Sequence, residues 1–277
     1  MNLFTAKETV ANYMKDAEVR MTSRRGSTFI LAILGGIFIG FGAVGSSLAV
    51  HNIDVVGTSR TLAGMIFPVG LMMVLLTGAK LFTGDCLMVM NVATKRNTLL
   101  QLIEVLLLVY AGNMIGGILL SLAVDFSGQF DYTSGLLGAY TIKVAAGKVA
   151  LPFSKALISG LLCNILVCTS VFMTGCVKDV VSKLFCVFFP IMLFVVCGFE
   201  HCVANMYYVP AGILAAANPE YARVAMEQYG LTAQQLADLN WVNFMLKNQL
   251  PVTIGNVIGG MACFALPLWF AHREDDR

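Results

Sequence analysis

Long apolar runs constrain this chain most, because they cover more than half of its 277 residues. A run of about 20 apolar residues is long enough to cross a hydrocarbon core of about 30 Å as a helix. The composition agrees, since 58% of the residues are hydrophobic and only 12% are charged, roughly half the charge of an ordinary soluble domain. The sequence therefore predicts an all-α membrane protein. It excludes a soluble domain, a disordered chain, a nucleic-acid-binding protein and a secreted disulfide scaffold.

The apolar runs predict six membrane-spanning segments, at 28–50, 61–94, 102–124, 154–177, 184–215 and 249–271. The second and the fifth are too long, and too polar at their centres, to be simple helices. Lys and Arg residues favour a cytoplasmic membrane protein with both termini in the cytoplasm, by the positive-inside rule. We expect a cytoplasmic amphipathic segment at 1–27, a six-helix transmembrane channel domain at 28–271 and a cytoplasmic tail at 272–277.

The segments outside the spans also carry signals. Near the N-terminus, apolar residues at helical spacing predict a short amphipathic helix, at a membrane surface or against neighbouring helices: Val10, Tyr13, Met14, Ala17 and Met21. We expect a folded loop at 125–153 and a short surface helix that begins at Thr232 within 216–248. The eight cysteines and three histidines show no metal-site spacing, so we expect neither a metal nor a cofactor.

A repeated hexapeptide divides the chain into two halves. Gly112–Gly117 reads G-N-M-I-G-G in the third span, and Gly255–Gly260 reads G-N-V-I-G-G in the sixth. Because each half has three spans, an odd number, the second half must insert in the opposite orientation. This predicts an inverted 3+3 repeat with a substrate path between the halves. The glycines are also expected to let helices pack closely.

Polar residues interrupt the second and fifth spans at matching places, over Thr77–Asp85 and Gly198–Asn205. Non-helical backbone at membrane depth is tolerated only where it is buried in protein or lines a wet cavity. Matched interruptions in two halves therefore indicate a translocation site. In the first interruption, Lys80 and Asp85 are expected to pair with each other or with helix ends.

Ionisable and polar residues within the spans are functional candidates, because their burial is costly. His201 is the leading one, since an imidazole beside a helix break can hydrogen-bond a small anion and titrates near neutral pH. Glu200, also a candidate for the substrate pathway, is expected first to brace the broken helix by accepting backbone N–H bonds, and direct contact with the substrate stays open. Asn164 and Asn256 are expected to act as hydrogen-bond braces, and Asn164 is also a candidate for orienting His201.

The residues around the interruptions resemble the formate/nitrite transporter family, and the resemblance covers all six spans. Four elements carry it: Leu81–Gly84, Gly160–Asn164 with Val167 and Cys168, Gly198–His201 with Val203–Met206, and Pro251–Asn256. The resemblance implies an aquaporin-like protomer and a homopentamer with one pore in each protomer. It also implies passage of small monovalent anions or their conjugate acids.

The resemblance assigns roles to individual residues. It makes His201 the central histidine, Thr83 the loop threonine, Asn164 a polar brace and Lys148 the vestibule lysine. One departure is Lys80, which stands where the family usually has an acidic or neutral residue and so alters the local electrostatics. Two constrictions are also implied: an inner one of Leu71 and Phe194, and an outer one of Phe67, Leu81 and Phe82.

The expected function is transport of a small monovalent anion, formate first, as the anion or the protonated acid. In this hypothesis Lys148 concentrates the anion, His201 mediates its protonation with Thr83 and Asn256 as hydrogen-bond partners, and the neutral acid crosses the constrictions. Nitrite or hydrosulfide stays open as the substrate. A channel for neutral solutes also stays open, as does a membrane enzyme using Glu200 and His201, although the sequence has no nucleophile, metal or cofactor motif for it.

Overall fold

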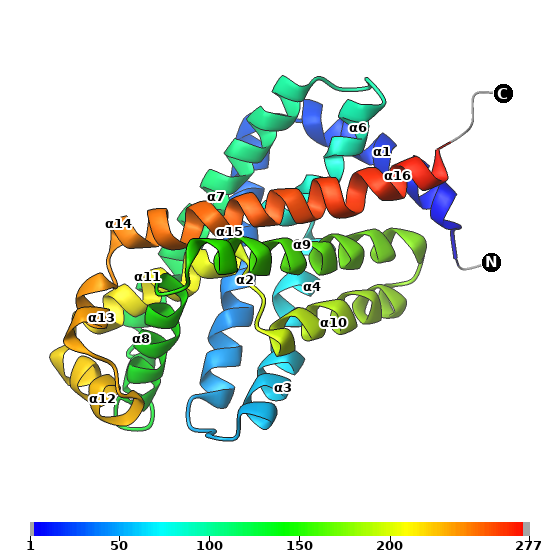
Figure 1. Cartoon of the computed structure of the whole chain (residues 1–277). Helices are drawn as coiled ribbons and strands as arrows, with labels where there is room; N and C mark the ends of the chain where they lie inside the picture. The colour runs from blue at the N-terminus through cyan, green and yellow to red at the C-terminus, as the bar shows by residue number, and fades with distance from the viewer. Residues whose placement is uncertain (1–2, 274–277) are drawn as a thin grey trace.

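The computed structural model describes residues 3–273, and its long elements are helices (Figure 1). Six helical stretches in this part of the chain are long and apolar enough to span a membrane: α2 (Arg25–Val50), α3 with α4 (Val56–Ile66 and Pro68–Thr77), α7 (Leu99–Phe126), α9 (Phe153–Cys176), α10 (Val180–Cys197) and the stretch from α14 to α16 (Trp241–His272). Two shorter apolar stretches complete the second and fifth spans: α5 with α6 (Phe82–Asp85 and Val89–Ala93) and α11 (Cys202–Ala216). The predicted six spans with two interruptions are confirmed.

The two hexapeptides pack the two halves in the same way. The first lies on α7, which packs along α2, and the second lies where α15 (Leu250–Val257) continues towards α16, along α9 (Figure 1). A Cβ on Gly116 would lie 2.1 Å from the carbonyl oxygen of Ile33, and one on Gly259 would lie 2.1 Å from that of Leu161. Glycine therefore lets the helices touch through their backbones at equivalent places, as an inverted repeat requires.

The amphipathic helix near the N-terminus is present as α1 (Ala6–Thr22). A capping box between Thr5 and Glu8 begins it, and four of the five predicted apolar residues are buried: Val10, Met14, Ala17 and Met21. The helix packs against α6, α7, α9 and α16 (Leu266–His272), so it lies against neighbouring helices. Most of the expected tail at 272–277 lies outside the described residues.

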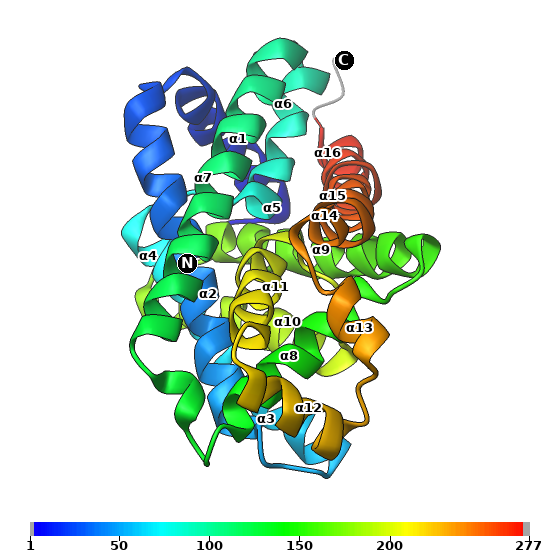
Figure 2. The ribbon, with the colours of Figure 1, turned by 90° about the vertical axis from the view of Figure 1, so that its left-hand side faces the viewer.

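The loop expected at 125–153 is largely a helix, α8 (Leu136–Val149), so that expectation was wrong. Its apolar and small residues bury one face, with Ile142 and Ala145 fully buried, against α11 and α12 (Pro219–Tyr229). Mixed Gly, Ser and Lys content hid this helical spacing. Thr232 caps α13 (Ala233–Asp238) as predicted, whereas the neighbouring helix α12 was not predicted. Figure 2 shows these helices gathered at one end of the molecule.

The last span begins at Trp241, eight residues before the predicted start at 249. Two π-helical segments, Phe244–Gln249 and Ile258–Ala265, lie within it. Each ends just before a Leu-Pro pair, which contains Pro251 in the first case and Pro267 in the second. A proline ring clashes with the carbonyl four residues earlier, and a wider turn moves that carbonyl aside. The polar residues at its start concealed this extension of the span.

Candidate functional site at the two helix breaks

The two breaks have the same backbone conformation. Gly78 follows α4 with φ 76°, and Gly198 follows α10 with φ 70°, which is the left-handed conformation that glycine tolerates best. The chain then extends to Leu81 (φ −130°, ψ 119°) in the first break and to His201 (φ −116°, ψ 114°) in the second. At those residues it turns into α5 and α11. The positions of the breaks agree with the interruptions predicted from the sequence.

Asn113, from the first hexapeptide, holds the first break in place. Its amide nitrogen donates to the carbonyl oxygens of Ala32 (2.7 Å) and Lys80 (2.9 Å), and its amide oxygen accepts the backbone N–H of Phe82 (3.0 Å). The fully buried side chain thus satisfies backbone groups that a helix would otherwise pair. The sequence analysis gave Asn113 no role, although its place in the repeated hexapeptide was a usable signal.

Asn256, from the second hexapeptide, makes equivalent bonds in the second break. Its amide nitrogen donates to the carbonyl oxygens of Gly160 (2.7 Å) and Glu200 (3.0 Å), and its amide oxygen accepts the backbone N–H of Cys202 (2.9 Å). These are the bonds of a brace. They use both the amide nitrogen and the amide oxygen of Asn256 on the protein itself, so the substrate contact expected of Asn256 is replaced by a structural one.

Replacing Asn256 by Ala is expected to lower the free energy of unfolding by more than about 2 kcal/mol, since each buried polar group left unpaired costs about 1–3 kcal/mol. Three groups lose their partner: two carbonyl oxygens and one N–H. Thermal unfolding in detergent would measure the change. Asn52→Ala, in the exposed turn after α2, is the matched control. Equal melting temperatures for both variants would contradict the bracing role.

His201 and Thr83 meet across the two breaks. The Nε2 atom of His201 lies 2.8 Å from Oγ1 of Thr83, and its Nδ1 atom accepts the backbone N–H of Ala204 (3.0 Å), capping α11. Because Nδ1 is an acceptor, the neutral ring carries its proton on Nε2 and donates it to the Thr83 hydroxyl. That hydroxyl keeps its own proton available for another acceptor. A second proton on Nδ1 would remove the cap of α11, so this geometry stabilises the neutral ring.

Asn164 acts on Thr83 rather than on His201. Its amide nitrogen donates to the carbonyl oxygens of Asn256 (2.7 Å) and Thr83 (3.3 Å), and the Cys168 thiol also donates to the Thr83 carbonyl (3.3 Å). The expected brace is therefore present, whereas the structure gives no direct bond by which Asn164 would orient His201. These bonds fix the backbone from which the Thr83 hydroxyl reaches the imidazole.

Lys148 and Glu200 form an ion pair at the second break. The Lys148 Nζ atom lies 2.9 Å and 3.1 Å from the two Glu200 carboxylate oxygens, and the Asn205 amide donates to the same carboxylate (2.7 Å). Asn205 in turn donates to Asn248, whose amide donates to the Lys148 carbonyl. Glu200 therefore braces the break through side-chain donors, and not through the backbone N–H groups that the sequence analysis expected.

Lys148 and Glu200 both line a cavity of about 370 Å³. Its deep wall contains the buried side chains of Phe67, Phe194 and His201, and its outer wall contains the exposed side chains of Arg60 and Lys143. Lys148 and Glu200 lie on the wall between them. We call this cavity the vestibule. Lys148 is a vestibule lysine by position, but Glu200 matches its charge. Arg60 and Lys143 are vestibule residues that the sequence analysis did not identify.

Phe67 and Phe194 lie in one layer at the floor of the vestibule. Their rings meet edge to face with centroids 5.5 Å apart, and the Phe194 ring centroid lies 5.9 Å from that of His201. The sequence analysis placed Phe67 and Phe194 in different constrictions, which the structure corrects. The two rings come together because α3 and α4 both pack against α10.

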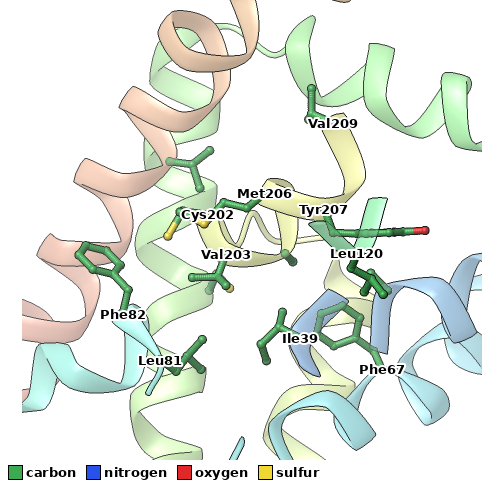
Figure 3. Packing of buried hydrophobic residues seen from close by; sticks show 14 of the residues in the cluster. Ile39, Phe67, Leu81, Phe82, Leu120, Cys202, Val203, Met206, Tyr207 and Val209 are labelled. Atoms are coloured by element: carbon green, nitrogen blue, oxygen red, sulfur yellow. The ribbon is translucent and has the colours of Figure 1, made fainter. Parts of the chain in front are cut away.

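Leu71, Leu81 and Phe82 do not line the vestibule and are buried deeper in the protein. Figure 3 shows Leu81 and Phe82 side by side at the start of α5, apart from Phe67. The Phe82 ring meets the ring of Tyr110 edge to face, 5.1 Å between centroids. Leu81 and Phe82 therefore form a second apolar group, separate from the layer of Phe67 and Phe194.

The first break is tied to α1. Arg20 pairs with the buried carboxylate of Asp85 (3.3 Å), and the Tyr13 hydroxyl donates to the Gly84 carbonyl (3.4 Å). Asp85 thus pairs with the N-terminal helix, and not with Lys80 as one of the two expectations had it. Sequence separation hid this contact, because Arg20 and Asp85 meet only when α1 folds back beneath α5.

Comparison with known proteins identifies the family. The family model for the formate/nitrite transporter matches residues 7–270. This chain belongs to the formate/nitrite transporter family. Membership confirms the resemblance seen in the sequence and places this chain among membrane transporters rather than enzymes.

Several relatives and solved structures in the formate/nitrite transporter family match most of the chain. "Formate channel FocA" of Haemophilus influenzae is 37% identical over 212 residues, 76% of this chain and 73% of that protein. "Formate channel FocA" of Escherichia coli strain K12 is 35% identical over 254 residues, 90% and 88% of the two chains. A structure titled "Pentameric formate channel with formate bound" superimposes with a TM-score of 0.77 at 32% identity and covers 90% of this chain and 98% of that one.

Proposed function

We propose that this protein is a channel for a small monovalent anion, with formate as its main substrate. One observation carries the proposal: beside a vestibule with basic residues, the buried neutral His201 ring donates to the Thr83 hydroxyl, whose own proton is left for another acceptor. Such a pair suits a small anion or its conjugate acid. The names of the curated relatives, which are formate channels, support formate over nitrite and hydrosulfide.

The proposed path crosses the protein in three stages. The anion enters the vestibule, where basic side chains attract it. The layer of Phe67 and Phe194 then makes the passage of a bare charge costly, because a charge leaving water without a partner loses its solvation. The anion becomes more basic as it is desolvated, takes a proton and passes as the neutral acid. Leu71, Leu81 and Phe82 form the second apolar barrier in this scheme.

The source of the proton follows from the state of His201. A neutral ring that gave up its Nε2 proton would become an imidazolate anion, which is far too basic to form at this site. We therefore propose that the Thr83 hydroxyl, oriented by the N–H that it accepts from His201, donates to the anion, and that the proton comes from water in the vestibule. Asn164 and Asn256 support this pair by holding the two breaks. The anion is thus still protonated at this site, while His201 stays neutral and donates to Thr83.

Assembly and orientation belong to the same proposal. The solved relative is titled as a pentamer, and its close superposition supports a homopentamer with one pore in each protomer. Exposed apolar side chains along the spans, such as Leu107 and Phe189, suit contact with lipid or with a second subunit. The distribution of Lys and Arg supports insertion in the cytoplasmic membrane with both termini inside.

Uptake of radiolabelled formate into proteoliposomes tests the proposal. We expect uptake well above that of protein-free liposomes, rising as the pH falls because a proton accompanies each anion. Nitrite, hydrosulfide, lactate and acetate, added as competitors, rank the substrates. If the protein passed uncharged solutes but took up no formate at any formate concentration, it would not be an anion channel. If hydrosulfide or nitrite competed more strongly than unlabelled formate, formate would not be the main substrate.

A further inference from the structure

Two basic side chains at the mouth of the vestibule have no carboxylate partner among the residues that the structure describes. Arg60 from α3 and Lys143 from α8 line both the vestibule and an adjoining cavity of about 460 Å³. Within residues 3–273, neither has a carboxylate oxygen within 4.0 Å, whereas Lys148 is paired with Glu200. Figure 2 shows α3 and α8 at the same end of the molecule. The net positive charge of the vestibule therefore comes from Arg60 and Lys143.

Arg60 is anchored by one edge of its guanidinium, and within residues 3–273 the other edge makes no hydrogen bond. Its Nη1 atom donates to the Val196 carbonyl at the end of α10 (3.3 Å). Gly198 makes room for it, since a Cβ there would lie 2.2 Å from Nη1. A guanidinium has five N–H donors in a rigid plane, so the bond to Val196 holds the group against the wall and leaves further donors for a ligand.

Lys143 is held in place by aromatic rings. Its Nζ atom lies 4.9 Å from the ring centroid of Tyr229 and 5.4 Å from that of Tyr140. A cation over a ring face is attracted to it and keeps its full charge. The ammonium is therefore positioned, but remains able to bind an anion.

We propose that Arg60 and Lys143 form an anion-binding site that captures a small carboxylate at the mouth of the vestibule. The site rests on the proposed function and adds its entry step. Guanidinium donors match the two oxygens of a planar carboxylate, which favours formate over an anion with a single acceptor atom such as hydrosulfide. Two acidic residues line these cavities: Glu200 is neutralised by Lys148, and Asp54 lies in the outer cavity, outside ion-pair distance of Arg60 and Lys143. Once captured, the anion is passed towards His201.

Concentration-dependent formate uptake at about 10 mM salt, where the Debye length is about 30 Å, tests the site. Arg60→Gln and Lys143→Gln are each expected to raise the half-saturating formate concentration about threefold to tenfold with little change in the maximal rate, because a rim charge acts on capture. At about 1 M salt the difference should disappear. Lys155→Gln, an exposed outer lysine that lines neither cavity, is the control and should behave as the wild type.

Arg60→Lys separates geometry from charge. It keeps the positive charge and loses the planar fork, so half-saturation by formate should still rise, whereas competition by hydrosulfide should stay as in the wild type. Gel filtration and thermal unfolding in detergent would show that each variant is folded, and Lys143→Gln tests the site independently of the Arg60 contact to α10.

The outcomes separate the two proposals. If the wild type takes up no formate, the proposed function fails. If the wild type is active and both Gln variants match it at low salt, the capture site alone is wrong. An equal change in Lys155→Gln would also overturn it, because the effect would then be one of general surface charge.

Discussion

His201→Asn is expected to yield a folded protein that takes up formate roughly tenfold to a hundredfold more slowly than the wild type. Without His201 to orient it, the Thr83 hydroxyl should lose its hydrogen bond to the charged anion, which is worth about 1.5–3 kcal/mol. The substitution separates two roles of the ring. Asn is among the best N-cap residues, so its side-chain oxygen can replace Nδ1 in accepting the Ala204 N–H. The shorter amide cannot reproduce the Nε2 contact to Thr83.

His201→Ala is the matched comparison, because it removes the cap of α11 as well. It should be as slow as His201→Asn and less stable by about 1 kcal/mol, the usual cost of replacing an N-cap residue by Ala. Proteoliposome uptake and thermal unfolding would be measured on the same preparations. Formate uptake by His201→Asn equal to that of the wild type at every pH would rule out a role for the imidazole in passage of the anion.

Lys148→Met is expected to destabilise the protein by about 3–5 kcal/mol, because removing one partner of a buried ion pair leaves the other charge uncompensated. The side chains of Lys148 and Glu200 are only 16% and 7% exposed, so water cannot readily replace the lost ammonium. The Asn205 amide would be the remaining donor to the carboxylate. Thermal unfolding in detergent would measure the loss.

The double variant Lys148→Met with Glu200→Gln controls for this interpretation. It removes both charges, so it should recover a large part of the stability lost in Lys148→Met. If the double variant instead lost as much stability as Lys148→Met and Glu200→Gln together, the two side chains would not be coupled. Glu200 lies in the second break, directly before His201, and its pair with Lys148 holds it there. We therefore expect formate uptake to be lowest in the least stable of these variants.

The inverted repeat gives the two breaks the same backbone conformation but different side chains. The bonds of Asn113 and Asn256 equate Lys80 with Glu200, and the residue that follows each is the extended one, Leu81 or His201. An apolar side chain thus stands in the first break where the imidazole stands in the second. Lys80, the departure from the family pattern, is one of these paired positions.

Much of the fold could be predicted from the sequence. Apolar length specified the six spans, the repeated hexapeptide specified the inverted halves, and polar residues within apolar runs specified both breaks, because each is a local pattern tied to a simple membrane constraint. The helix at 136–149 was missed, since its one buried face is diluted by Gly and Lys. The last span was predicted to start eight residues too late, because polar residues such as Asn243, Lys247 and Asn248 interrupt the apolar pattern at its start.

Partner choice was the part that only the tertiary structure decided. The sequence by itself predicted His201 and Glu200 as buried ionisable candidates, and the family resemblance added Thr83 and Lys148. It could not determine that Lys148 neutralises Glu200, that Arg20 reaches Asp85, or that Phe67 meets Phe194. Each of these pairs joins helices far apart in the chain. Local patterns report burial, whereas such contacts depend on the angles at which whole helices pack.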